Sequence, residues 1–166
     1  MTRLVLFLLR LMALALSYTL SCAVAAAAIT FVIFLGQDIG WLAFAPERDP
    51  AELVLTWASA SAFFGTVWFT ILPAAFWPAV VVFAVQEGAR LRSLLSHLLG
   101  GAAIAVAAVV LTIGMGAGPD APSGLDGGAW LTVLTAGFFG GAAHWLLAGH
   151  RAGKWLGPDR PDPVVE

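Results

Sequence analysis

Four long stretches of the chain contain no charged side chain, and short segments that hold the charges separate them. These stretches are residues 11–37, 53–86, 93–119 and 127–150, each longer than 20 residues. A helix needs about 20 mainly apolar residues to cross roughly 30 Å of hydrocarbon. The pattern predicts an all-α, multi-pass membrane protein, a four-helix transmembrane bundle whose spans cover about 8–35, 57–86, 94–115 and 128–150.

The composition supports a membrane location. Hydrophobic residues make up 60% of the 166 residues, only 11% are charged, and the mean hydropathy is +0.91. A water-soluble domain has too little interior to hide that much apolar surface. We expect residues 1–155 to form one four-span domain, with the lipid bilayer as its surroundings. Residues 156–166 are rich in proline and are expected to form a disordered cytoplasmic tail.

The distribution of cations predicts the orientation in the membrane. Seven of the eight Lys and Arg residues lie before the first span, between spans two and three, or after the fourth: Arg3, Arg10, Arg90, Arg92, Arg151, Lys154 and Arg160. Because cations are held on the cytoplasmic side during insertion, both termini should be cytoplasmic. The first apolar stretch continues to Leu35, beyond the core of a secretory signal, so we expect it to be retained as a helix.

The second span has a readable start and two internal prolines. Asp49 is a candidate cap before Pro50. Pro73 and Pro78 each remove a backbone donor, so we expect a kink in this helix. Hydroxyl side chains form a stripe along the same helix: Thr56, Ser59, Thr66 and Thr70. They either bond to carbonyls or to another helix, or they line a passive path for a small neutral solute.

Small residues mark one flank of the fourth span and the start of the third. Gly137 and Gly141 form a GxxxG pair, and Ala136 and Gly140 form a second small pair one residue earlier. Gly100 and Gly101 offer a similar surface on the third span. Such surfaces let helices approach closely. They are expected to pack against spans of this chain, against a second copy in a homo-oligomer, or against a larger membrane complex.

Two histidines are the one group of residues in the sequence whose positions suggest a cofactor or metal site. His97 and His144 lie roughly 7 to 10 Å inside the predicted cytoplasmic boundary, on consecutive antiparallel helices. Two imidazoles on neighbouring helices are a known way to hold a haem iron, so haem b binding, or part of a metal site, is one hypothesis. The alternative is that both are hydrogen-bonded polar residues, with no cofactor and no metal.

Other chemistries lack the residues that they need. No Asp, Glu, Lys or Arg lies in the central part of any span, which disfavours ion-coupled transport. Phosphate-binding, G-x-S-x-G and paired-cysteine motifs are absent, Cys22 being the single cysteine. A net charge of -2 gives no basic footprint for nucleic acid. We therefore expect neither an enzyme nor a nucleic-acid-binding protein.

The end of the fourth span carries a family resemblance. Its sequence, GGAAHWLLAGHRAG from Gly140 to Gly153, resembles the ending of small, functionally uncharacterised four-helix proteins of the bacterial inner membrane. The resemblance covers about 14 residues, implies an inner-membrane location and brings no activity with it. The leading functional hypothesis is a structural or accessory role through the Gly/Ala faces. The alternatives are a haem or metal subunit using His97 and His144, and a passive channel along the kinked second span.

Overall fold

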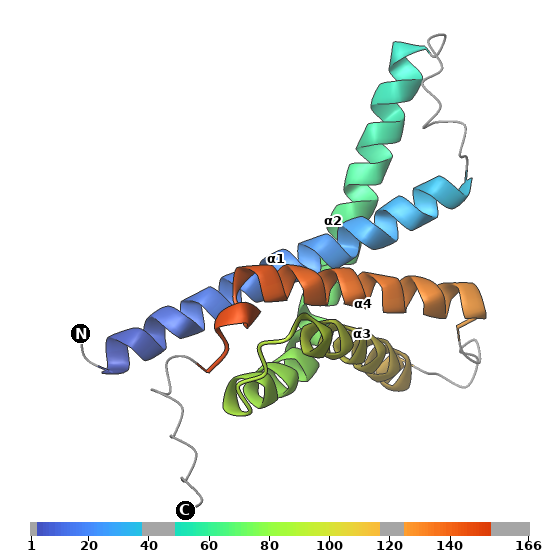
Figure 1. The fold of residues 1–166 in the computed structure, drawn as a ribbon. Helices are drawn as coiled ribbons and strands as arrows, with labels where there is room; N and C mark the ends of the chain where they lie inside the picture. Colours follow the sequence, from blue (N-terminus) through green and yellow to red (C-terminus); the bar gives the residue numbers. More distant parts are fainter. Residues whose placement is uncertain (1–2, 38–48, 117–124, 154–166) are drawn as a thin grey trace, which may run out of the picture.

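The computed structural model describes residues 3–37, 49–116 and 125–153, which form four long helices and a short 3₁₀ turn. In chain order these are α1 (Arg3–Gln37), α2 (Pro50–Gly88), α3 (Leu94–Gly116), α4 (Gly127–Leu147) and η2 (Gly149–Arg151) (Figure 1). Each of the four helices contains a stretch long and apolar enough to cross a membrane. The prediction of four apolar helices is confirmed, and the described part of the chain contains no strand. The expected tail, 156–166, lies outside the described residues.

Two of the helices begin at an aspartate that caps them. The Asp49 carboxylate accepts a hydrogen bond from the backbone N–H of Ala51, at 3.0 Å, with Pro50 as the first helical residue. The Asp126 carboxylate accepts from the N–H of Ala129, at 2.7 Å. Each cap satisfies a backbone donor that the helix leaves free, and places a negative charge at the positive end of the helix dipole.

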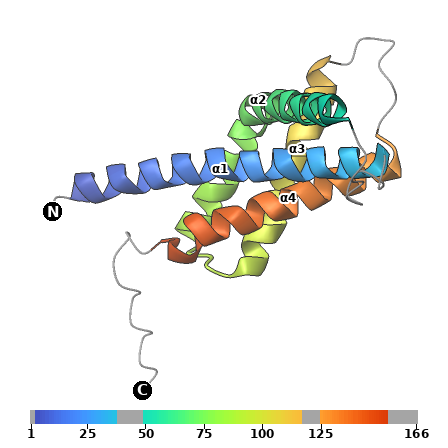
Figure 2. The same cartoon turned by 90° about the horizontal axis from the view of Figure 1, so that it is seen from above.

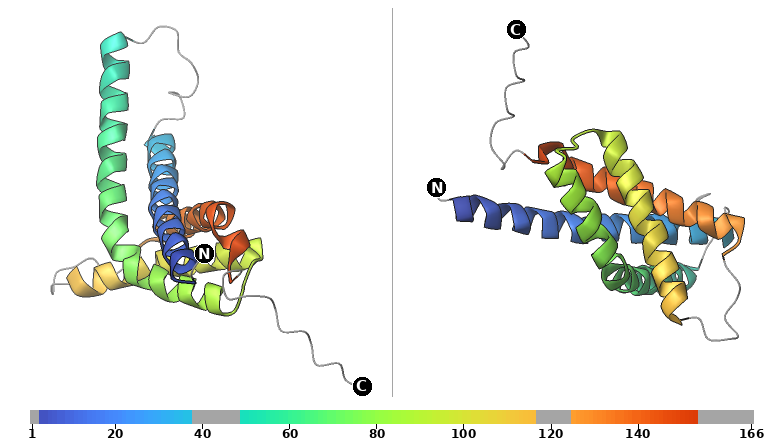
Figure 3. Two further views of the ribbon diagram at one scale, coloured as in Figure 1. Left: turned by 90° about the vertical axis from the view of Figure 1, so that its left-hand side faces the viewer. Right: turned by 90° about the horizontal axis from the view of Figure 1, so that it is seen from below.

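The helices cross in two pairs. α1 and α4 lie side by side and run in opposite directions, while α3 and the second half of α2 form another antiparallel pair that crosses them (Figure 2). The view from below shows the same crossing (Figure 3). α3 contacts α4 and α1 contacts α4 most extensively. α4 therefore lies at the centre of the packing, and its buried side is made of Ala136, Gly137, Gly140, Gly141 and His144.

α2 is bent so sharply that its two halves belong to different parts of the molecule. Pro73 and Pro78 lie inside this 39-residue helix. The first half of α2 leaves the bundle and touches α1 where the rings of Phe63 and Phe34 lie 6.0 Å apart, whereas the second half runs beside α3 (Figure 3). A proline leaves the carbonyl four residues earlier without its usual donor and pushes against it, which opens the helix on that side. The bend leaves Leu55 and Phe69, each 70% exposed, without cover from the bundle.

Candidate functional site

Glycines of α3 and α4 form the closest contact between helices. A Cβ atom added at Gly137 would lie 2.7 Å from the carbonyl oxygen of Gly101. One added at Gly101 would lie 2.8 Å from the Cα of Gly141. Real Cβ atoms do not approach backbone atoms this closely, so the crossing requires glycine.

The other two predicted packing glycines also face neighbours within the chain. A Cβ at Gly140 would lie 3.3 Å from the carbonyl oxygen of Ser21 in α1. One at Gly100 would lie 2.5 Å from the amide nitrogen of Gln86 in α2. The small-residue faces of α3 and α4 are thus covered by α1, α2 and each other. They are occupied within one copy of the chain.

An ion pair joins α1 to α2 at the end of the fold where α2 turns into α3. The Arg10 guanidinium binds the Glu87 carboxylate, with Nε at 3.0 Å and Nη2 also donating, and Nη2 donates to the carbonyl of Ala148 at 3.1 Å. The other carboxylate oxygen accepts from the N–H of Gly153, at 2.8 Å. The two side chains are only 12% and 11% exposed. The two residues are 77 positions apart, and the sequence did not predict this contact.

The two predicted histidines do come together beneath this ion pair. Their ring centroids are 5.6 Å apart, and the His144 ring also stacks on Phe83 with centroids at 3.9 Å. His144 Nδ1 and the Ser17 hydroxyl are hydrogen-bonded at 2.7 Å, and His97 Nδ1 donates to the carbonyl of Ser93 at 2.9 Å. Both histidines are buried. Each therefore has one ring nitrogen fixed by a neighbour.

The geometry does not fit a haem or a metal ion between these rings. A ligand to iron needs open space in front of its free nitrogen. The free nitrogen of His97, Nε2, faces the backbone of Gly149, where there is no room even for a methyl group. Within the described residues, no three His, Cys, Asp or Glu side chains converge as a metal-binding group. The paired histidines instead form a buried polar cluster, which we define as Ser17, Phe83, His97 and His144.

A serine bonded to a histidine is also the arrangement of a nucleophile and its base. Ser17 is 1% exposed and is not among the residues that line the neighbouring cavity. A substrate in that cavity would not reach its hydroxyl. The Ser17 to His144 bond therefore holds α1 to α4 and gives no sign of catalysis.

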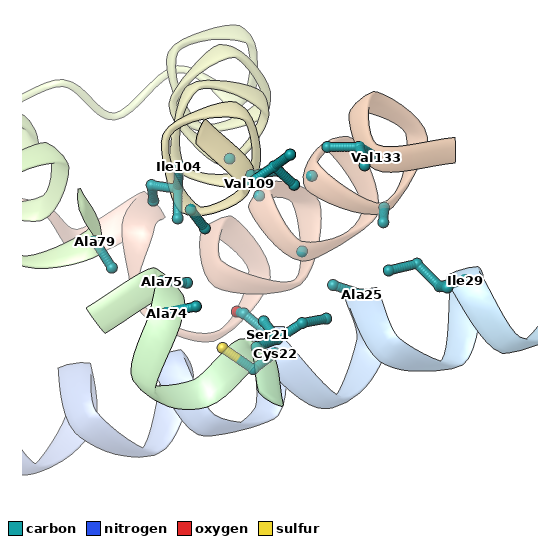
Figure 4. Close-up of a pocket in the computed structure, with 18 of the residues that line it drawn as sticks. Ser21, Cys22, Ala25, Ile29, Ala74, Ala75, Ala79, Ile104, Val109 and Val133 are labelled. Atoms are coloured by element: carbon teal, nitrogen blue, oxygen red, sulfur yellow. The ribbon is translucent and has the colours of Figure 1, made fainter. Parts of the chain in front are cut away.

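A cavity of about 520 Å³ extends from the histidines along the interior faces of all four helices. Figure 4 shows Ser21, Cys22, Ala25 and Ile29 of α1 across from Ala74 and Ala75 of α2, with α3 and α4 closing the other side. The lining on α3 runs from His97 to Ile113, about 24 Å at the ideal rise. Most of the wall is Ala, Ile, Val and Gly. The space is within the size range of ligand pockets and is apolar along most of its length.

The hydroxyl stripe of α2 does not form this lining. Thr66 donates to the carbonyl of Ala62 at 2.9 Å, and Thr70 to that of Thr66 at 2.8 Å, and both side chains are exposed. These are not the carbonyls that Pro73 and Pro78 leave free, which belong to Phe69 and Ala74. Of the four stripe residues, only Thr70 borders the cavity. The stripe bonds to its own helix and offers little to a passing solute.

No protein-family model, curated protein or solved structure matches this chain. The four long apolar helices agree with the architecture that the resemblance of Gly140 to Gly153 implies. That segment itself lies in α4 and η2, where it contributes the contact with α1 and the buried His144.

Proposed function

We propose that this protein is an accessory component of the bacterial inner membrane, with both termini in the cytoplasm and no catalytic role. The orientation is supported by the distribution of cations. The start of α1, the turn from α2 to α3 and the end of α4 meet at one end of the fold, where Arg10 binds Glu87 and Arg92 donates to the carbonyl of Ala152 at 2.9 Å. Among the described side chains, this one end would therefore carry Arg10, Arg90, Arg92 and Arg151 on the cytoplasmic side.

The single observation that supports an accessory role is the position of the first half of α2. This half leaves the bundle at the proline bend (Figure 1). Val54, Leu55, Trp57 and Phe69 are all more than half exposed. A helix that its own bundle does not cover can pack against a transmembrane helix of another subunit.

The partner surface proposed here differs from the one expected from sequence. The Gly/Ala faces of α3 and α4 already serve contacts within the chain. The contact surface that we propose is the large apolar side chains on the first half of α2, which would fit between the side chains of an apolar partner helix through van der Waals packing. The partner is a second copy of this chain or a subunit of a larger membrane complex.

Site-specific crosslinking in native membranes tests this role. A photoreactive amino acid replaces Leu55 or Phe69 on the first half of α2. The control site is Leu95 on α3, which is 64% exposed. We expect protein adducts from the two α2 sites and lipid adducts alone from position 95. The adduct mass separates a second copy from a different subunit. Lipid adducts alone at all three sites would refute the accessory role.

A reporter fusion tests the orientation separately. An enzyme that is active only in the cytoplasm, fused after residue 166, should be active. A periplasmic reporter at the same position should be silent. The opposite result would refute the proposed topology and leave the partner surface unaffected.

A further inference from the structure

We propose that the cavity between the four helices binds a lipid alcohol of the surrounding membrane, with its single apolar chain along α3 and α4 and its hydroxyl head at Gln86 and Ser21. This inference is independent of the partner surface on α2. It rests on the shape of the cavity, the chemistry of its wall and two buried polar atoms.

The shape favours a chain over a compact molecule. The lining covers about 24 Å of α3, close to the thickness of the hydrocarbon core, while the volume is about 520 Å³. A space that extends this far suits an extended molecule better than a compact one. It suits one extended hydrocarbon or isoprenoid chain.

The wall is almost free of polar groups that a chain would have to desolvate. Lining hydroxyls bond to carbonyls within the protein: Tyr18 to Leu72, Thr112 to Ala108 at 2.7 Å, and Thr132 to Gly128 at 3.0 Å. The rest of the wall around them is alanine, glycine and branched aliphatic residues, as Figure 4 shows for Ala25, Ile104 and Val133. Binding in this part of the cavity is therefore apolar and independent of the details of the chain.

Three residues that line the cavity have a polar atom without a partner among the described residues: His97, whose Nε2 faces Gly149, and also Gln86 and Ser21. Gln86 is 4% exposed, and its amide nitrogen donates to the carbonyl of Ser96 at 3.1 Å. Because a carbonyl can only accept, the amide nitrogen must face Ser96, and Oε1 lies on the other side of the group with no partner. The Ser21 hydroxyl, on the adjacent wall, is also buried and unpartnered.

These atoms define the head group that the cavity would select. Gln86 Oε1 accepts and cannot donate, so the head must carry a donor. The Ser21 hydroxyl can donate to the oxygen of that same head. A hydroxyl provides one donor and two acceptor sites, and a buried polar atom without a partner is costly enough that a bound hydroxyl would be favoured. An ether or ester head can accept but cannot donate, so it leaves Gln86 unsatisfied.

Photolabelling of the purified protein in detergent tests the site. The probe is hexadecanol bearing a diazirine in its chain, and labelled residues are located by mass spectrometry. We expect adducts on residues that line the cavity, removed by excess unlabelled hexadecanol. Hexadecyl methyl ether should compete about tenfold less well, the value for one to two lost hydrogen bonds.

Neighbouring substitutions provide the control. Val109→Phe puts a ring into the cavity, whereas Val110→Phe places the same ring on the outer face, where Val110 is 54% exposed. Cavity adducts should fall at least tenfold in the first variant and persist in the second. If Val109→Phe fails to fold, Val133→Phe fills the same space from α4. If a variant with a phenylalanine in the cavity and the Val110→Phe control were labelled equally, the cavity would not be the binding site.

Ser21→Ala tests the head group without removing a bond that the protein makes internally. The preference for hexadecanol over its methyl ether should fall several-fold, while total adducts of the chain remain. A methyl ether that competes as well as the alcohol in the unaltered protein would overturn the assignment of a lipid alcohol. Such a result would indicate a plain acyl chain in its place.

Discussion

The two ends of α2 are both apolar, yet one is locked into the bundle and the other stands outside it. The second half carries Ala75, Ala79, Gln86 and Glu87, all buried, and packs against α3 and α1. The first half carries Leu55, Trp57 and Phe69, all largely exposed. Burying apolar area does not distinguish the halves, because lipid is as apolar as a neighbouring helix. Paired polar groups distinguish them, because Gln86 donates to the carbonyl of Ser96 and Glu87 binds Arg10 in the second half. Small residues alone do not, since the run of alanine and serine at 58–62 in the first half is mostly exposed.

The largest expected effect comes from breaking the ion pair at the packed end. Glu87→Gln leaves the Arg10 guanidinium buried without its countercharge and weakens the contact with the N–H of Gly153. Removing one partner of a buried pair typically costs about 3 to 5 kcal/mol. We expect a loss near the lower end of that range in the free energy of unfolding, measured by equilibrium denaturation in micelles.

Glu52→Gln is the matched control at the other end of the same helix. Glu52 lies in the first turn of α2, where its side chain is exposed. Its contribution is the interaction of a carboxylate with the helix dipole, under about 1 kcal/mol. Equal losses in the two variants would mean that the ion pair does not distinguish the two ends of α2.

The next largest loss of stability is expected from adding one methyl group at the closest helix crossing. Gly101→Ala places a Cβ against the backbone of Gly141, which cannot move without separating α3 from α4. We expect a loss of about 1 to 3 kcal/mol in the free energy of unfolding. In Gly114→Ala, on the same helix, nothing lies within 4 Å of the new Cβ, so the stability should be unchanged or slightly higher. If Gly101→Ala left the free energy of unfolding unchanged, α3 and α4 could move apart at this crossing without loss of stability.

Features set by local sequence could be predicted, and those set by pairing between distant residues could not. Four uncharged stretches specify four helices, Asp49 and Asp126 mark two helix starts, and Pro73 and Pro78 lie inside α2. Arg10 and Glu87 are 77 residues apart. Nothing in the residues around either one identifies its partner, because a charge at the edge of a span is ordinarily solvated.

The same distinction applies to the candidate site. That His97 and His144 lie at the same level of neighbouring helices could be predicted from their distance to the nearest cations, but the orientation of the rings could not. That orientation depends on Ser17, Phe83 and Gly149, which come from three other segments. The cavity was not foreseen, because a residue that faces empty space has the same apolar character as one that faces lipid. The Gly/Ala faces were predicted as contact surfaces with packing inside the chain as one of three alternatives, and the sequence alone did not decide among the three.

A smaller effect is expected from the hydrogen bond within the buried polar cluster. Ser17→Ala leaves His144 Nδ1 buried without a partner. This should cost about 1 to 3 kcal/mol. Ser21→Ala, one helical turn away, removes a buried hydroxyl that bonds to no described residue, so denaturation should show no loss. If Ser17→Ala and Ser21→Ala lowered the free energy of unfolding equally, the loss would reflect the smaller side-chain volume and not the hydrogen bond to His144.

The smallest expected effect lies in the turn that ends the packed half of α2. Arg90 has a φ of 54°, in the left-handed region where glycine is normally found after a helix, and the N–H of Leu91 bonds to the carbonyl of Gln86 at 2.9 Å. Arg90→Gly relieves the backbone strain but increases the entropy of the unfolded chain, so the net change should not exceed about 1 kcal/mol. Arg90→Val has a branched Cβ in the same conformation and should lose about 1 to 2 kcal/mol. If Arg90→Gly lost as much stability as Arg90→Val, contacts of the arginine side chain, which both variants remove, would outweigh the backbone conformation in the turn that joins α2 to α3.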